Sequence, residues 1–225
     1  MTVKKKLLCG FATLTILIAL SSCSGCSGSR GNEGGNGNTI LPGEAPVNPQ
    51  VEVLDNIADE SILATIDGIR NDMIIVTETR TGRRYDLKYG QAELQEKIKG
   101  TLSVGAHFSI LPDKSMENVI IAVNVDELSG RWFYDMDQHR GLAFEKKGGL
   151  SSINSGSRSY REWKLKNGRL YIYFVTEDMV APDRHEFLVE EASIKDLDKD
   201  HLVFELGGQI FDCRRQTQAV QFQNN

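Results

Sequence analysis

The chain has 225 residues, with 26 Lys and Arg against 31 Asp and Glu, so its formal net charge is −5. No segment predicted to fold is basic, which argues against binding driven by nucleic-acid phosphates and against electrostatic adhesion to anionic lipids. Four cysteines exclude a disulfide scaffold in a chain of this length. We expect Cys213 to be a small buried hydrophobic side chain.

The N-terminus carries a segment typical of export. Residues 4–6 are lysines, and the apolar run 7–20 is shorter than the roughly 20 residues that a membrane-spanning helix needs. Small residues then lead to Cys23. This order resembles a bacterial lipoprotein signal, and the resemblance implies that Cys23 is lipidated and begins the mature chain. The alternative is a plain signal peptide with an incidental cysteine.

The lipoprotein resemblance also implies a location. Acyl chains such as palmitate on Cys23 would hold the protein in the membrane of a bacterial cell envelope. The outer membrane is the favoured location, and the side of the membrane stays open.

Changes of composition along the chain predict five segments. Residues 1–22 form the signal peptide, and 23–50 form a flexible tether of Gly, Ser, Asn and Pro. Such a tether has too few apolar side chains to offset the entropy of ordering it. Residues 51–126 and 127–215 are two β domains, and 216–225 form a polar tail.

The first β domain shows three strands, one helix and two further strands. The helix is predicted over 92–99, where Leu94 and Ile98 share a face, and Gly100 ends it. Alternating or apolar runs predict the strands 61–67, 73–76, 83–89, 104–111 and 118–125. This order resembles the five-stranded OB-type small barrel, which places one helix between its third and fourth strands.

The second β domain is predicted to be an antiparallel barrel. Asn167-Gly168 lies between two alternating runs and is a strong hairpin signal. Gly148-Gly149 and Gly207-Gly208 indicate further tight turns. The predicted strands are 132–136, 141–145, 150–153, 159–165, 170–175, 185–191, 202–206 and 209–214.

A short motif at the start of this domain resembles the Gly-x-Trp signature of lipocalins. It reads Gly130-Arg131-Trp132. The resemblance implies a mainly β chain ending in a compact lipocalin-like β-barrel, in which Trp132 packs at the barrel base under an arginine of the last strand. We assign that arginine as Arg214, with Arg215 as the alternative. The domain is shorter than ordinary lipocalins, so its cavity is expected to be shallow or absent.

Aromatic side chains supply the candidate ligand-binding residues of this barrel. They are Trp163, Tyr171 and Tyr173. Within 170–175 both alternating faces are apolar enough to be inside, so the pattern leaves open which face lines a cavity. Filling a core is the competing role for these side chains.

No catalytic, metal or cofactor site is predicted. Asp135, Asp137 and His139 are interpreted as a solvated hairpin end, and 196–200, with alternating aspartates, as a charged turn. The sequence contains no glycine-rich phosphate loop between a strand and a helix and no nucleophile-elbow motif.

These patterns predict a non-catalytic lipoprotein of the cell envelope. Its barrel would bind a small apolar or amphipathic ligand or an envelope protein, and it would contact the membrane through acyl chains and bind no nucleic acid. One alternative is a structural or assembly role with solid barrels and no pocket. A second alternative is a hydrolase of the envelope, which would need clustered ionisable residues in a cleft.

Overall fold

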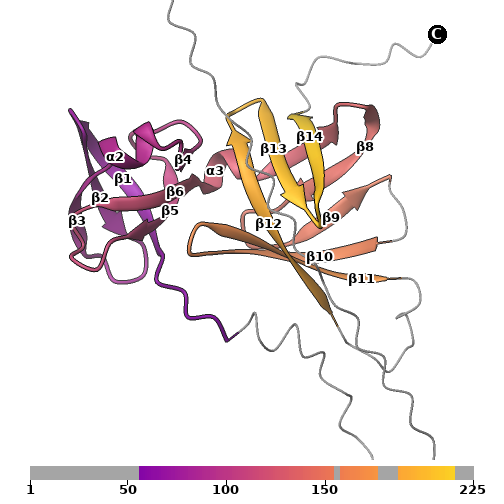
Figure 1. The fold of residues 1–225 in the computed structure, drawn as a ribbon, viewed down its shortest axis with the longest axis horizontal. Helices are drawn as coiled ribbons and strands as arrows, with labels where there is room; N and C mark the ends of the chain where they lie inside the picture. The colour runs from indigo at the N-terminus through magenta and orange to yellow at the C-terminus, as the bar shows by residue number, and fades with distance from the viewer. Residues whose placement is uncertain (1–55, 155–157, 177–186, 216–225) are drawn as a thin grey trace, which may run out of the picture. The chain divides into compact units, whose positions relative to one another are not determined.

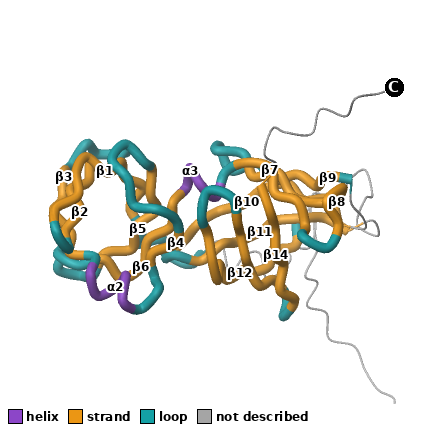
Figure 2. The backbone as a smooth tube through the Cα atoms, turned by 90° about the horizontal axis from the view of Figure 1, so that it is seen from above, coloured by secondary structure: helices purple, strands orange, loops and turns teal. Residues whose placement is uncertain are grey.

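The protein is described by a computed structural model over residues 56–154, 158–176 and 187–215. The predicted signal peptide, tether, lipidation site Cys23 and polar tail lie outside the described residues. Two β-sheets and two short helices make up the described part (Figures 1 and 2). The expected mainly β fold is confirmed. None of the described helices is both long enough and apolar enough to span a membrane.

The first sheet has six strands in the order β3-β2-β1-β5-β6-β4. Its elements are β1 (Ile62–Arg70), β2 (Met73–Glu78), β3 (Arg84–Lys88), α2 (Gly90–Leu94), β4 (Ile98–Lys99), β5 (His107–Pro112) and β6 (Val119–Asn124). The pairs are antiparallel except for β4 with β6. A parallel bridge joins Lys88 to Asn118, so the end of β3 also meets the segment before β6. The sheet is therefore mixed.

The helix of this sheet is shorter than predicted. It ends at Leu94, which is 82% exposed, whereas the sequence pattern placed Leu94 and Ile98 on one face of a longer helix. Glu96 has a left-handed φ of 55°, which cannot continue an α-helix. Ile98 then pairs in parallel with Ala122 and packs against the core of this sheet. A long-range strand pairing thus replaces the last helical turn.

The second sheet has eight strands in the order β10-β11-β12-β13-β14-β7-β8-β9. After α3 (Val125–Leu128) come β7 (Gly130–Tyr134), β8 (Asp137–Phe144), β9 (Leu150–Ile153), β10 (Arg158–Lys166), β11 (Arg169–Thr176), β12 (Leu188–Leu197), β13 (His201–Leu206) and β14 (Gln209–Arg215). The outer strands β9 and β10 meet at a Gly149–Glu162 bridge, where the Trp163 amide donates to the Gly148 carbonyl at 2.7 Å. The sheet is therefore a nearly closed antiparallel barrel.

The predicted hairpin at Asn167-Gly168 is confirmed. Asn167 and Gly168 have φ of 51° and 74°, the left-handed pair that a two-residue turn with right-handed strand twist requires. The turn fixes the register of β10 on β11, in which Trp163 faces Ile172 and Lys164 faces Tyr171. Side chains directly opposite one another in this register lie on one face of the barrel wall.

The half of the barrel around Trp132 is filled by side chains. The largest of them, Trp132, Phe204, Leu142 and Leu202, have at most 1% of their surface exposed, and Trp163 joins the same cluster. This part of the interior is a packed hydrophobic core.

Candidate functional site

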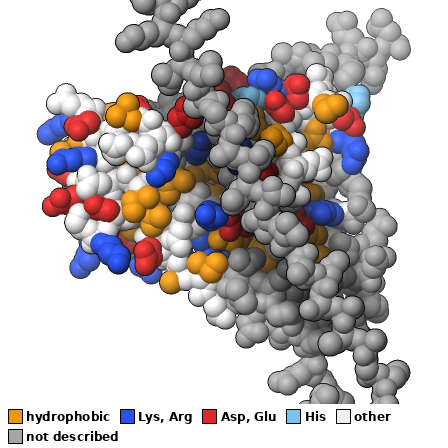
Figure 3. All heavy atoms as spheres, in the orientation of Figure 1, with side chains coloured by type: hydrophobic (Ala, Val, Ile, Leu, Met, Phe, Trp, Pro, Cys, Tyr) orange, Lys and Arg blue, Asp and Glu red, His pale blue; other side chains and the backbone are white. Residues whose placement is uncertain are grey.

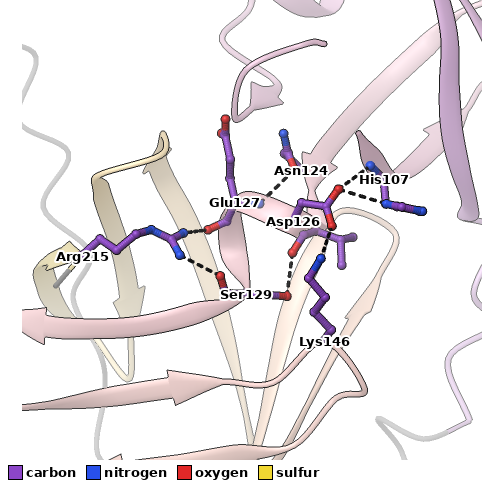
Figure 4. Close-up of polar contacts among 8 residues, drawn as sticks. His107, Asn124, Asp126, Glu127, Ser129, Lys146 and Arg215 are labelled. Carbon is purple, nitrogen blue, oxygen red and sulfur yellow. Dashed lines mark hydrogen bonds and ion pairs between the residues drawn. The ribbon is translucent and has the colours of Figure 1, made fainter. Parts of the chain in front are cut away.

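The base of the barrel is closed by an arginine stacked on a tryptophan. The Arg215 Cζ lies 4.2 Å from the centroid of the Trp132 ring, and the Trp132 indole N–H donates to the Leu128 carbonyl at 2.8 Å. Arg215 also donates to the carbonyl of Ser129 at 2.9 Å and to the carbonyl of Glu127 (Figure 4). These contacts join β14, the last strand of the barrel, to α3 and to β7, the first strand of the barrel.

The assignment of Arg214 to this position is wrong. Arg214 pairs with Phe133 in the ladder, and its side chain lies 3.6 Å from the carboxylate of Asp135. Alternation along β14 turns Arg215 inward and Arg214 outward. Gly130 makes room for Arg215, because a Cβ added there would lie 2.2 Å from the Arg215 Nη1.

A polar network surrounds Asp126 of α3 (Figure 4). Its carboxylate accepts from the His107 backbone N–H at 2.9 Å and from the Lys146 Nζ at 2.9 Å, and it lies 3.0 Å from the His107 Nδ1. Burial alone would raise the pKa of Asp126, but the contacts with Lys146 and His107 outweigh it and lower the pKa to about 2. The network satisfies the carboxylate fully, which fits a structural role.

A cavity of about 520 Å³ lies toward the other end of the barrel. Tyr134 is two residues beyond Trp132 on β7, and Phe211 is four residues before Arg215 on β14, so both point inward away from the base. The lining residues are Tyr134, Met136, Asp137, Arg140, Arg158, Tyr160, Leu206, Gly207, Gln209, Ile210, Phe211 and Asp212. The volume falls within the range of roughly 300–1,000 Å³ typical of small-molecule sites.

Aromatic rings form the inner wall of this cavity. The ring centroids of Tyr134 and Phe211 are 5.6 Å apart, and Phe211 stacks on the buried Phe204 at 5.0 Å. Tyr160 lies 6.0 Å from Phe174. Tyr134, Tyr160 and Phe211 are only partly buried, and they pack against the barrel core. They therefore offer apolar surface at the boundary between the filled core and solvent.

The polar lining of the cavity combines two arginines and two tyrosines with Gln209 and two aspartates. Arg158 pairs with Glu190 at 3.0 Å and lies 4.5 Å from the centroid of the Phe174 ring. Burial raises the pKa of Tyr134 and of Tyr160, and Arg158 partly opposes the shift at Tyr160. Both phenols therefore stay protonated at neutral pH and can donate.

The three predicted ligand-binding aromatics do not come together at this cavity. Trp163 is 5% exposed in the core and donates its indole N–H to the Glu145 carbonyl at 3.0 Å. Tyr171 and Tyr173 point to the opposite face of the wall, in a separate cluster with Val189. The sequence reasoning missed Tyr134, Tyr160 and Phe211. Tyr134 and Phe211 continue inward alternations from Trp132 and Cys213, whereas a bulge between Tyr160 and Glu162 puts Tyr160 out of step with Trp163.

The acidic clusters of the sequence have structural partners. Asp135 pairs with Arg214, and the Asp198 carboxylate accepts the backbone N–H groups of Asp200 and His201 at 2.7 Å each. His201 lies between Asp196 and Asp212, at 3.3 and 2.8 Å. Over 56–154, 158–176 and 187–215, no three His, Cys, Asp or Glu side chains are arranged to hold a metal ion. On the face shown in Figure 3, basic and acidic side chains are interspersed over the described part.

Comparisons with known proteins agree with this architecture. Residues 124–216 match a family model described as lipocalin-like. The chain is also similar to the crystal structure of a lipocalin-like protein from Bacteroides thetaiotaomicron, with 22% identity over 40% of this chain and 97% of that chain and a TM-score of 0.33. No curated protein matches the sequence. The C-terminal part of the chain, from Asn124 through the barrel, is therefore similar to lipocalin-like domains.

Proposed function

We propose that the barrel binds a small apolar or amphipathic molecule in the cavity bounded by Tyr134, Tyr160 and Phe211. The carrying observation is the cavity of about 520 Å³ next to a packed core, in a domain whose lipocalin-like fold suggests binding. Partly exposed aromatic walls favour a ligand with a flat or apolar body, since that body would displace water from them. The role is non-catalytic.

A structural or assembly role is the second candidate. It is favoured by the solid packing of the barrel half around Trp132 and Phe204. In that account the shallow cavity stays solvated and binds nothing saturably. The two accounts differ in whether the cavity takes up a ligand.

A cavity-filling substitution distinguishes them. Gln209 lines the cavity, opposite Leu206 in the ladder, so Gln209→Trp places an indole at its mouth. Glu205→Trp is the matched control, because Glu205 alternates outward next to the inward Leu206. Ligand-observed NMR over a panel of small aromatic and amphipathic compounds should find saturable binders that Gln209→Trp abolishes and Glu205→Trp keeps. If no compound of the panel binds saturably, or if Gln209→Trp does not weaken the binding that is found, the structural role is favoured.

We further propose that the barrel is displayed on a lipid-anchored chain in the cell envelope. The support is the export signal and Cys23 in the sequence. The first β module is proposed to be an OB-type spacer or protein-binding unit. Its support is the order of three strands, α2 and further strands, together with the Lys88–Asn118 bridge.

The anchor is tested by metabolic labelling with a clickable fatty acid. Cys23→Ala should abolish the label, whereas Cys26→Ala, a change at the nearby cysteine, should keep it. Labelling that persists in Cys23→Ala would refute the anchor without bearing on the cavity.

A further inference from the structure

We propose that the cavity selects ligands with a carboxylate beside a flat apolar body, and that Arg140 is the residue that recognises the charge. The inference rests on the proposed binding function of this cavity and deepens it by naming the ligand class.

The first cation, Arg158, is already compensated. Its guanidinium pairs with Glu190 at 3.0 Å and covers the ring of Phe174. Glu190 faces Ile172 in the ladder and so points into the barrel, which places the ion pair inside the mouth. A ligand anion approaching Arg158 would meet the Glu190 carboxylate beside it, so Arg158 contributes little net attraction.

The two carboxylates that line the cavity edge each contact another group through one oxygen. The Asp137 Oδ1 accepts the backbone N–H of His139 at 3.1 Å. The Asp212 Oδ1 lies 2.8 Å from the His201 Nε2. Neither aspartate forms an ion pair with an arginine of the cavity among residues 56–154, 158–176 and 187–215.

Arg140 is the second arginine of the cavity. It lies on β8 next to the register shift between β7 and β8, its side chain is exposed, and it lines the cavity. Within the described ranges it has no carboxylate at ion-pair distance. Burial raises the pKa of the Tyr134 phenol. The positive charge of Arg140 partly opposes that rise, so the two side chains are electrostatically coupled.

Three hydrogen-bond donors therefore line the same cavity. They are the Arg140 guanidinium and the hydroxyls of Tyr134 and Tyr160, which stay protonated because burial raises both pKa values. A planar guanidinium matches a carboxylate in two parallel hydrogen bonds, and phenol donors can add a third. The aromatic rings beside them would cover the flat part of the same ligand.

A matched pair of compounds tests the charge preference. Naphthaleneacetate and the neutral naphthaleneacetamide have nearly the same shape and differ in charge. Calorimetric titration of the full chain should give a dissociation constant about two- to fivefold lower for the acetate, the size expected for one partly exposed charge pair. In Arg140→Gln the two compounds should bind equally, while Arg140→Lys should keep part of the preference.

Two further variants sharpen the test. Lys147→Gln removes an exposed cation of the turn between β8 and β9, which does not line the cavity, and it should leave the preference unchanged. Glu190→Gln frees Arg158, so the preference for the acetate should grow. Thermal unfolding monitored by circular dichroism verifies that each variant is folded.

The outcomes separate this inference from the proposed function. Equal binding of the two compounds to the wild-type chain overturns charge selection and leaves the binding cavity standing. A preference that survives in Arg140→Gln overturns Arg140 as its source. Failure of both compounds to bind saturably, together with an empty ligand panel, overturns both proposals.

Discussion

The guanidinium of Arg215 lies 4.2 Å from the ring centroid of Trp132, and this stack ties the last strand of the barrel to the first. The ring is fully buried, and burial lowers the pKa of Arg215 even though Asp200 and Glu127 oppose the shift. A desolvated cation–π pair of this kind is worth about 2 kcal/mol. The barrel base is therefore a stability element at the end opposite the cavity.

Arg215→Gln should lower the free energy of unfolding by about 2 kcal/mol, since it removes the stack and the donors to the Ser129 and Glu127 carbonyls. Arg214→Gln is the matched control on the next residue. It breaks one exposed ion pair and should change stability by less than about 1 kcal/mol. Urea unfolding measures both, and equal losses would contradict the inward position of Arg215.

Trp132→Ala should lower the free energy of unfolding by about 3–5 kcal/mol, because it leaves a large cavity at a site with no exposed surface. Ligand binding at the other end should persist in the folded fraction. The measurement is urea unfolding followed by circular dichroism. A loss below about 1 kcal/mol would mean that the base of the barrel is not packed on this ring.

Because of the network around Asp126, part of the free energy of unfolding should depend on pH in the acid range. The pKa of Asp126 is about 2 in the folded chain against an ordinary 3.8, so its stabilisation is fully present above 3.8 and is lost as pH falls through about 2. The stability difference between wild type and Asp126→Asn should therefore be largest near neutral pH and shrink in this acid window. Urea unfolding at a series of pH values measures it. A difference that is constant with pH would contradict the network.

The Cys213 thiol should be unreactive in the folded protein. It has no exposed surface, and burial, with a smaller effect from Asp212, raises its pKa to about 12. Iodoacetamide at neutral pH should leave the Cys213 peptide unmodified in the native chain and modify it in urea, as read by mass spectrometry. Rapid modification without urea would show that the barrel core opens readily.

Much of the barrel could be predicted because alternation and turn chemistry act locally. The strand Leu150–Ile153 and the Asn167-Gly168 hairpin are found as expected. The end of α2 could not be predicted, since it depends on the parallel pairing of Ile98 with a strand more than twenty residues away. Arg214 was assigned in place of Arg215 because the sequence alone did not define the inward face of β14.

The cavity was harder to predict for two physical reasons. A register shift in β8 between Asp137 and Gly141 and a bulge in β10 between Tyr160 and Glu162 interrupt the alternation of these two strands where they line the cavity. Which arginine stays uncompensated depends on the β10–β11–β12 register, which brings Glu190 to Arg158. In contrast, the Asn167-Gly168 turn fixes the pairing of β10 with β11. Counting residues from that turn shows that Trp163 and Tyr171 lie on opposite faces of the barrel wall.

The central claim is that a ligand occupies the cavity at Tyr134, Tyr160 and Phe211, away from the barrel base. The chain has only two tryptophans, and their indole N–H groups bond to the carbonyls of Leu128 and Glu145 inside the core. Proton–nitrogen NMR spectra recorded during titration with naphthaleneacetate test this claim most directly. We predict saturable shifts of the backbone amides of the three cavity residues, with both indole signals nearly unmoved. Saturable shifts of the indole signals without shifts at the cavity amides would contradict the account.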